Sequence, residues 1–426
     1  MIAATDDTTV QQTALSKQTL LGRVPGSCLI YLMRILYLSP RQCWPPVGGS
    51  KLRDFHLARA LGQNAELTYV YFKGEKGIPS EEFPFCRNLI AINKPKPYTP
   101  GKIFRGLISR TPLTLINYSS PEMAAAVTEL TRNSRFDLVH LDCIQTLSYL
   151  KNLPDALRRR AVVNWHNIES EILRRYAVNT PSLAKKFYAL ATARRLESLE
   201  RDALRTTLAH VVCSDRERQL LLEWAPDALI EVVENGVDTR AFHSQAHSPR
   251  SRVLFVGLMG YHANSDAAVW FAERVWPAIH ESFPHWTMTI VGSDPTPQVR
   301  ALAARSGIEV TGTVPDVKPY YNQAIFSVVP LMTGGGTRLK ILEALAAGVP
   351  VISTSVGTEG LAVTHGNEVL IADHEADWLP ACSSLADQGE LWRNLVAAGR
   401  RLVETRYDWD ILGQSLVALC RKWASA

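Results

Sequence analysis

Residues 330–360 hold the densest group of side chains suited to chemistry, arranged as strand end, loop, helix and strand. The loop contains three successive glycines: Gly334, Gly335 and Gly336. Glycine lets a backbone approach a ligand closely, because no Cβ stands in the way. The helix predicted next, at 337–347, carries Arg338 and Lys340 in its first turn, where free N–H groups already create positive potential. Two further cations there are explained if an anion such as a diphosphate binds at this helix end.

Glu343 follows about one turn later, and its two carboxylate oxygens could accept hydrogen bonds from a pair of sugar hydroxyls. The alternative interpretation is a glycine turn followed by solvated charges on a surface helix. The sequence contains no GxxxxGK(S/T) pattern, which excludes a nucleoside-triphosphate loop of that type.

The composition is that of a globular enzyme, with 46% hydrophobic and 20% charged residues. A chain of 426 residues is long for one core, so two domains are expected. The formal charge of +5 is too small to indicate a nucleic-acid partner.

Positive charge is concentrated between residues 151 and 205. The basic residues there include Arg158, Arg159, Arg160, Arg174, Arg175, Lys185, Lys186, Arg194 and Arg195. This stretch predicts attraction to an anionic membrane surface or an anionic acceptor. A solvated helix face is the alternative.

The seven cysteines form no CxxC pair, and several lie in apolar, strand-like runs. This pattern favours buried thiols in a reducing cytoplasm over disulfides or zinc, and the histidines show no metal-ligand spacing. No apolar run approaches the ~20 residues that span a bilayer. The sequence therefore predicts a cytoplasmic protein, with peripheral contact at the inner face of the cell membrane as a further hypothesis.

Apolar runs alternate with amphipathic stretches along most of the chain. Strands are predicted at 33–38, 66–72, 88–92, 137–141, 161–165, 208–213, 252–257, 286–291, 309–313, 325–329, 350–353 and 368–371. Helices are predicted at 50–62, 119–132, 169–206, 214–223, 264–281, 297–306, 337–347, 388–404 and 409–424. This alternation indicates an α/β fold with two doubly wound parallel sheets covered by helices.

Five segments follow from this pattern. They are residues 1–32, interpreted as a disordered extension or as the result of a start site assigned too far upstream, a first domain at 33–235, a linker at 236–250, a second domain at 251–405 and a C-terminal helix at 406–426. Each half has a glycine-bearing loop at a strand's carboxyl end, at 45–51 and 331–337, where doubly wound sheets bind ligands. We expect the two loops to face each other across a cleft.

The sequence resembles the retaining family 4 glycosyltransferases with the GT-B fold, and the resemblance covers nearly all of 33–425. The segments that carry it are the glycine pair at 48–49, SDRERQLL at 214–221, ENGVD at 234–238, FVGLMGYHANSDAAVWF at 255–271, and GGGTRLKILEALAAGVPVISTSVGTEG at 334–360. The exopolysaccharide-type sugar transferases are the most similar in character. No single segment is decisive, whereas their order and spacing together are specific.

The resemblance implies transfer of a sugar from a nucleotide-sugar donor to a glycan or lipid-linked acceptor, with retention and without a metal or other cofactor. Negative charge then builds on the leaving diphosphate, and without a metal it must be stabilised by cations and a helix N-terminus. Arg338 and Lys340 are the candidate cations, and the backbone of the three glycines would assist them. Glu343 matches the second Glu of the family's Glu-x7-Glu pair, which binds the ribose.

Two departures from the family pattern concern the donor. The first Glu of that pair would fall at Gly335 and is missing, and so are the basic residues expected after the first strand of the second domain, where Leu258 stands. Asn264 is nevertheless a donor-binding candidate, with capping of the helix that follows as the alternative. Val314 is a candidate for backbone contact with the nucleobase.

In the first domain, Asp142 stands at about the position of the family's donor-facing His, with His140 inside the strand. His166 follows the next strand and is therefore expected at the cleft, with a structural loop histidine as the alternative. Gly49 would let the backbone reach the diphosphate or the sugar, with a bare turn as the alternative.

Two other functions compete with transfer. A GT-B epimerase acting on a nucleotide sugar would need several carboxylates in the cleft, and few are found. A pseudo-transferase, which binds nucleotide sugar or serves as a scaffold, is supported by the missing first Glu.

Overall fold

The structure is a computed structural model that describes residues 32–74, 77–109, 111–180, 182–242, 251–333 and 338–425. The predicted extension at 1–32 lies outside the described residues except for Leu32, and so does most of the predicted linker at 236–250.

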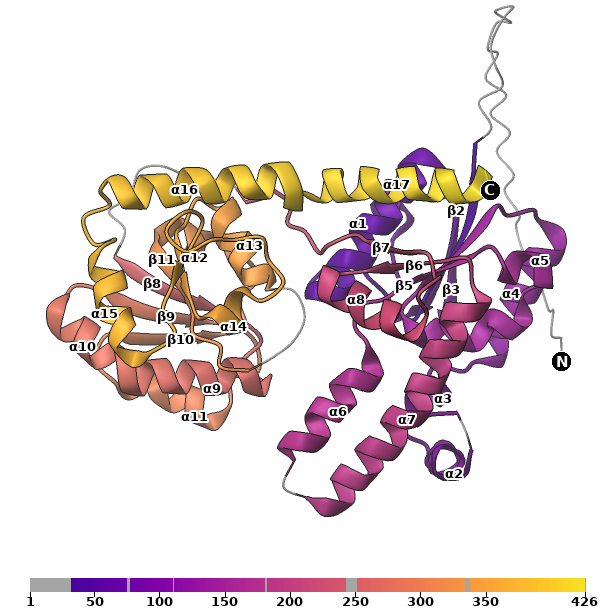
Figure 1. The fold of residues 1–426 in the computed structure, drawn as a ribbon, viewed down its shortest axis with the longest axis horizontal. Helices are drawn as coiled ribbons and strands as arrows, with labels where there is room; N and C mark the ends of the chain where they lie inside the picture. Colours follow the sequence, from indigo (N-terminus) through magenta and orange to yellow (C-terminus); the bar gives the residue numbers. More distant parts are fainter. Residues whose placement is uncertain are drawn as a thin grey trace, which may run out of the picture. The chain divides into compact units, whose positions relative to one another are not determined.

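The first sheet has seven parallel strands in the order β3–β2–β1–β4–β5–β6–β7 (Figure 1). The strands are β1 (Arg34–Ser39), β2 (Glu66–Lys73), β3 (Asn88–Asn93), β4 (Leu138–Asp142), β5 (Ala161–Asn164), β6 (Ala209–Val212) and β7 (Ile230–Val232). The chain winds from β1 to β2 on one side and returns to β4 on the other. The carboxyl ends of β1 and β4 therefore flank the switch point at which such sheets bind ligands.

The second sheet has six parallel strands in the order β10–β9–β8–β11–β12–β13. They are β8 (Arg252–Val256), β9 (Thr287–Val291), β10 (Ile308–Gly312), β11 (Ala324–Val329), β12 (Val351–Ser353) and β13 (Leu370–Ile371). Its switch point lies between β8 and β11. The two parallel sheets confirm the predicted α/β class, whereas the exact domain boundaries stay a prediction.

Helices of the first half cover both faces of its sheet, and each face has its own apolar core. They are α1 (Gly49–Asn64), α2 (Pro100–Ile108), α3 (Leu113–Ile116), α4 (Pro121–Asn133), α5 (Asp155–Arg158), α6 (Glu169–Asn179), α7 (Leu183–Thr206) and α8 (Asp215–Trp224), with 3-10 turns at Ser80–Glu82 and Ile144–Asn152.

In the second half the strands and helices enclose one continuous core. The helices are α9 (His262–Trp270), α10 (Trp276–Ser282), α11 (Pro297–Ala301), α12 (Lys318–Gln323), α13 (Leu339–Ala346), α14 (Ser355–Thr358), α15 (Glu375–Ser383) and α16 (Glu390–Leu402); α17 (Trp409–Ser425) follows them along the chain. Short non-α turns join several of them, at Phe271–Val275, Leu302–Ala304 and Val403–Tyr407.

The final helix, α17, packs on the first sheet and not on the second. Its apolar side chains, which include Trp409, Leu416 and Trp423, belong to the same core as Leu57 and Leu61 of α1. The chain thus returns to its first half after completing the second.

The observed strands lie within two residues of the predicted ones, because buried parallel strands are apolar runs that stand out in a sequence. The short strand β7 was missed, and the single helix predicted over 169–206 is wrong. It is two helices, α6 and α7. Thr180 has an extended backbone before a proline in the sequence, and the Ser182 side chain caps α7 by accepting from the Lys185 N–H.

The six described cysteines are unpaired, and all but Cys86 are buried; Cys28 lies outside the described residues. Among the helices of the described residues, none combines the length and the apolar character needed to cross a bilayer.

Candidate active site

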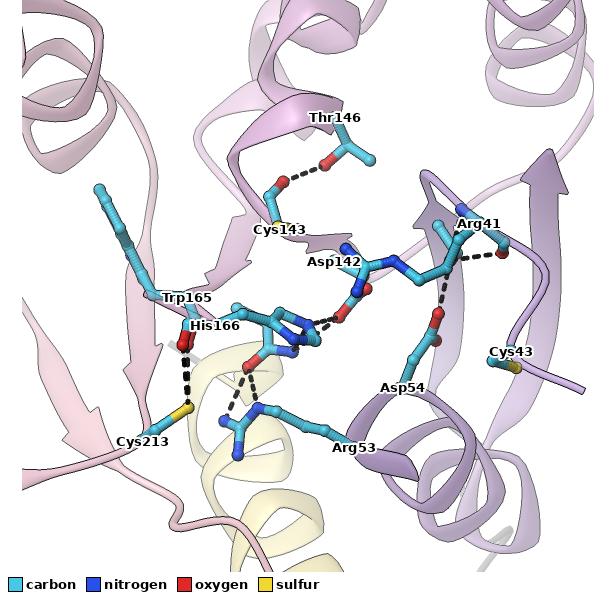
Figure 2. A network of polar contacts seen from close by, with 12 residues as sticks. Arg41, Cys43, Arg53, Asp54, Asp142, Cys143, Thr146, Trp165, His166 and Cys213 are labelled. Atoms are coloured by element: carbon cyan, nitrogen blue, oxygen red, sulfur yellow. Dashed lines mark hydrogen bonds and ion pairs between the residues drawn. The ribbon is translucent and has the colours of Figure 1, made fainter. Parts of the chain in front are cut away.

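Asp142 and His166 meet at the carboxyl ends of β4 and β5 (Figure 2). The His166 Nε2 atom lies 2.8 Å from Asp142 Oδ1, and the side chains are 7% and 0% exposed. Because a carboxylate only accepts hydrogen bonds, Nε2 carries the proton and Nδ1 presents a lone pair. The structure thus brings together two residues that the sequence proposed separately.

Arg53 supports this pair from α1, through Asn164 at the end of β5. The buried guanidinium donates from Nε and Nη2 to Asn164 Oδ1, at 3.0 and 2.8 Å. The Asn164 amide in turn donates to Asp142 Oδ1 over 2.7 Å. Arg53 Nη1 also donates to Val233 O over 2.7 Å, so one side chain ties together α1, β5 and the segment after β7. The orientation of His166 is therefore fixed before any ligand binds.

Burial and charge shape the titration of this group. Burial alone would raise the pKa of Asp142, but the neighbouring His166 and the guanidinium of Arg41 hold that pKa well below its ordinary value. Burial lowers the pKa of His166, against the attraction of Asp142. At neutral pH the pair is therefore an ionised carboxylate and a neutral imidazole. The Asp142 Oδ2 atom is buried without a hydrogen-bond partner in the described residues.

The glycine loop after β1 leads directly into α1. Gly48 has φ +89°, a conformation that favours glycine, and its carbonyl accepts the first helical hydrogen bonds of α1. At Gly49 an added Cβ would lie 3.2 Å from Leu339 Cδ1 in the first turn of α13. The backbone of the first loop thus lies beside the helix that carries the predicted diphosphate-binding cations.

Lys340 and Asn264 form the centre of the second group. The Lys340 Nζ atom donates to Asn264 Oδ1 over 2.7 Å and lies 4.8 Å from the centre of the Phe255 ring. Asn264 lies inside α9 and donates to Leu258 O over 2.9 Å, so it positions the lysine and does not cap the helix. Gly257, after β8, makes room for this arrangement, because a Cβ there would lie 2.9 Å from Nζ.

Arg338 is buried immediately before α13, and its Nη2 atom donates to Val356 O over 3.3 Å. Burial and the nearby Arg338 charge lower the pKa of Lys340 to about 7. Burial likewise lowers the pKa of Arg338. Two cations held close together in a poorly solvated place favour an anionic ligand.

Glu343 lies one turn along α13 and accepts a hydrogen bond from the Tyr321 hydroxyl on Oε2, at 3.1 Å. The same hydroxyl lies 3.2 Å from Lys340 O. Burial raises the pKa of Glu343 to about 7, against the hydrogen bond from Tyr321 and the charge of Lys340. Tyr321 therefore fixes the carboxyl group at the predicted ribose position.

The remaining predicted residues are placed only in part. Gly334, Gly335 and Gly336 lie outside the described residues. Val314 follows β10 and packs, half-buried, against the second core. No cluster of three or more potential metal ligands occurs in the part of the chain that the structure describes.

Sequence reasoning missed Arg41, Arg53, Asn164 and Tyr321. Arg53 had a usable signal, because it lies one and two turns before the apolar Leu57 and Leu61 on the buried face of α1. Asn164 also had one, as a polar residue that ends an apolar strand. Tyr321 had none, since its partner on α13 is 22 residues away.

Comparison with known families matches both halves of the chain. Residues 47–241 match the family described as Glycosyltransferase Family 4, and residues 250–388 match the one described as Glycosyl transferases group 1.

Among curated proteins, an uncharacterized protein in the cps region of Klebsiella pneumoniae is 23% identical over 258 residues, which are 58% of this chain and 64% of that protein. The putative teichuronic acid biosynthesis glycosyltransferase TuaH of Bacillus subtilis is 25% identical over 215 residues, 44% of this chain and 50% of that protein. The matches thus span about half to two thirds of the length of these relatives.

Solved structures share the fold over almost the whole chain. The sucrose-phosphate synthase of Thermosynechococcus elongatus has a TM-score of 0.68 at 19% identity, covering 92% of this chain and all of that one. HepE of Anabaena, in complex with UDP and glucose, has a TM-score of 0.62 at 14% identity, covering 91% of this chain and 99% of that one.

Proposed function

We propose that this chain, which belongs to the family 4 glycosyltransferases with the GT-B fold, transfers a sugar from a nucleoside-diphosphate sugar to a glycan or lipid-linked acceptor, with retention at the anomeric carbon and without a metal. In this proposal residues 251–405 bind the donor, and residues 33–235 form the acceptor side.

The cluster at the start of α13 is the observation that carries the proposal. Lys340 donates a hydrogen bond to Asn264. Burial and the nearby positive charge of Arg338 both disfavour the protonated form of Lys340. A diphosphate would bring further negative charge to these two cations, and the Gly49 backbone lies beside the same helix turn. The carboxyl group of Glu343, oriented by Tyr321, would accept from the ribose hydroxyls.

The Asp142–His166 pair would act on the sugar. As the glycosidic bond breaks, positive charge develops on the sugar ring and negative charge on the leaving diphosphate. An ionised Asp142 favours the first, and Arg338 with Lys340 favours the second. The Nδ1 lone pair of His166 would accept from a sugar hydroxyl, because Nε2 is already held by Asp142.

The relatives suggest the pathway type. The names of TuaH and of the Klebsiella cps-region protein refer to teichuronic acid synthesis and to the cps region, and HepE was solved with UDP and glucose. The first two names support a role in cell-surface polysaccharide synthesis, and the ligands of HepE make UDP-hexoses the first donors to try.

Thermal shift with a panel of UDP-, GDP- and ADP-sugars tests donor binding, using wild type, Arg338→Ala and Glu343→Ala. We expect one donor class to stabilise the wild type and neither variant. Lys318→Ala is the matched control, since the side chain of this lysine is 42% exposed, forms an ion pair with Asp316 and lies over the Phe242 ring. If no nucleotide sugar shifts the wild type at millimolar concentration, a scaffold without donor binding replaces the proposal.

The donor found in this way is then used in a transfer assay. We expect the product to keep the anomeric configuration of the donor, as read from its NMR coupling constant, and the rate to be unchanged by EDTA. Inversion, or loss of the rate with EDTA, would contradict those parts of the proposal.

A further inference from the structure

Exposed apolar side chains gather on one part of the first half. Ten of the 18 large apolar side chains that are exposed in the described residues fall within 98–108 and 172–188. An even spread over the surface would not place more than half of them in two short segments. Large exposed apolar patches mark interaction sites.

The densest part is formed by α2 and the first turns of α7. Its exposed apolar residues are Ile103, Phe104, Ile108, Leu183, Phe187 and Tyr188, which together define the α2–α7 surface. Phe187 and Leu183 are 73% and 72% exposed, although they are large enough to form a core. Leu183 and Phe187 lie one turn apart on α7, so they point to the same side.

The two helices are joined, so the surface has a defined scaffold. Arg195 Nη1, on α7, donates to Gly106 O of α2 over 2.7 Å. Figure 1 shows α6 and α7 as a helical pair that extends away from the first sheet, with α2 beside α7. Ala189, Ala193 and Leu196 are buried on the opposite face of α7, and Leu196 belongs to an apolar core of the first half.

The charge around this surface is basic. Lys185, Lys186 and Arg194 are exposed on α7, and no described acidic residue forms an ion pair with them. Arg194 follows Leu183 and Phe187 on the same helix face, at a spacing of three and two turns. A cavity of about 330 Å³ lies farther along α7, beside Leu199 and Thr206, and its lining includes Arg105, Lys151 and Arg158 together with the acidic Asp202.

We propose that the α2–α7 surface docks on an anionic lipid bilayer, with its apolar side chains inserted among the acyl chains and its lysines and arginines on the headgroups. An amphipathic helix with aromatic and aliphatic residues beside cations has the chemistry of an interfacial anchor. A protein partner would match some of these residues, but Lys185, Lys186 and Arg194 form no ion pair within the described residues, which favours a negatively charged surface. This proposal rests on the proposed function in one respect only: docking on a bilayer would bring a lipid-linked acceptor to the enzyme.

Vesicle co-sedimentation tests the proposal. The vesicles contain phosphatidylcholine alone or phosphatidylcholine with phosphatidylglycerol, and the proteins are wild type, Leu183→Asp/Phe187→Asp and Leu229→Asp. Leu229 is a matched control, because it is 51% exposed but lies before β7, away from the surface. We expect the double variant to bind the anionic vesicles at least about tenfold more weakly, and the control to bind like the wild type.

Salt separates insertion from charge attraction alone. Inserted apolar side chains predict that high salt weakens wild-type binding without abolishing it, whereas Lys186→Ala/Arg194→Ala lowers binding and reduces the salt dependence. Complete release by salt, or equal binding of the double variant and the wild type, would overturn the proposal. So would sedimentation showing that the wild type self-associates and the double variant does not, because a second copy would then be the occupant.

Transfer to a soluble acceptor is measured on the same proteins. We expect the double variant to retain the wild-type rate, since the surface residues lie outside the proposed active site. A failure of docking with intact transfer therefore concerns only this inference, and a failure of transfer with intact docking concerns only the proposed function.

Discussion

The two halves of the proposed active site differ in how complete they are without a ligand. On the first sheet, Arg53, Asn164, Asp142 and His166 form a continuous chain of hydrogen bonds. At α13, by contrast, Lys340 and Glu343 have each lost much of their tendency to carry charge, and Lys340 lies close to the like charge of Arg338.

This difference indicates two uses of buried charge. In the first group the charged and polar side chains are hydrogen-bonded to one another within the fold, which holds their geometry as in preorganised sites. In the second group burial disfavours the charged forms of Lys340 and Glu343, so we expect the charge of this group to change when an anionic ligand binds. Substitutions should therefore cost stability in the first region and function in the second.

Replacing Arg53 should have the largest effect. Arg53→Met leaves Asn164 Oδ1 and Val233 O without their donor, and we expect a loss of about 3 kcal/mol in the free energy of unfolding. Arg59→Met, on the same helix, is the control, because Arg59 is more exposed and forms an ion pair with Asp410. It should cost at most about 1 kcal/mol. Urea denaturation measures both, and equal losses would remove the structural role of Arg53.

Replacing Lys340 should produce the opposite pattern. Lys340→Met removes a half-buried ammonium but keeps the side-chain length, so we expect transfer to fall by about 10²-fold, while the free energy of unfolding falls by no more than about 1 kcal/mol because burial already disfavours the charged lysine. Initial rates and urea denaturation are measured on the same preparation. A loss of stability as large as that of Arg53→Met would abolish the contrast between the two regions.

The free energy of unfolding should depend on pH through Glu343 and Lys340 of α13. Burial raises the pKa of Glu343 from 4.5 to about 7, so between these values the folded protein keeps a proton that the unfolded chain releases, and stability falls as pH rises. Burial lowers the pKa of Lys340 from 10.5 to about 7, so above pH 7 the unfolded chain holds the extra proton and stability rises.

The contribution of these two groups is therefore lowest near pH 7 in the absence of ligand, with slopes of at most about 1.4 kcal/mol per pH unit for each. Glu343→Gln should remove the decrease below pH 7, and Lys340→Met the increase above it. Denaturation at a series of pH values measures this, and curves that both variants leave unchanged would contradict it.

The smallest effect concerns the space that Gly257 provides. In Gly257→Ala the new Cβ would lie 2.9 Å from Lys340 Nζ and Asn264 Nδ2, so we expect the lysine to shift and nucleotide-sugar affinity to fall by about tenfold. Gly101→Ala is the control, since its Cβ would meet no atom within 4 Å. Calorimetric titration with the donor compares the two, and unchanged affinity in Gly257→Ala would show that Lys340 need not lie at this place.

Much of the α13 group could be predicted from the sequence. Arg338, Lys340 and Glu343 lie within six consecutive residues: Lys340 and Glu343 are three residues apart on α13, and Arg338 immediately precedes that helix. The strands were equally predictable, because parallel strands buried on both faces are apolar runs. The place of segment 45–51 also followed from strand order, since doubly wound sheets place such loops at their carboxyl edges, whereas most of the predicted loop at 331–337 lies outside the described residues.

Only the tertiary structure joined residues that are distant along the chain. Arg53 and Asn164 are 111 residues apart, and Tyr321 and Glu343 are 22 apart, so no local pattern links them. The position of α17 on the first core was decided in the same way, because its apolar face would suit either half. The sequence alone determined which elements form and which local groups can carry charge. Packing decided which of these groups are hydrogen-bonded to distant residues, as Asp142 and His166 are, and which are half-buried at the proposed ligand site, as Lys340 and Glu343 are.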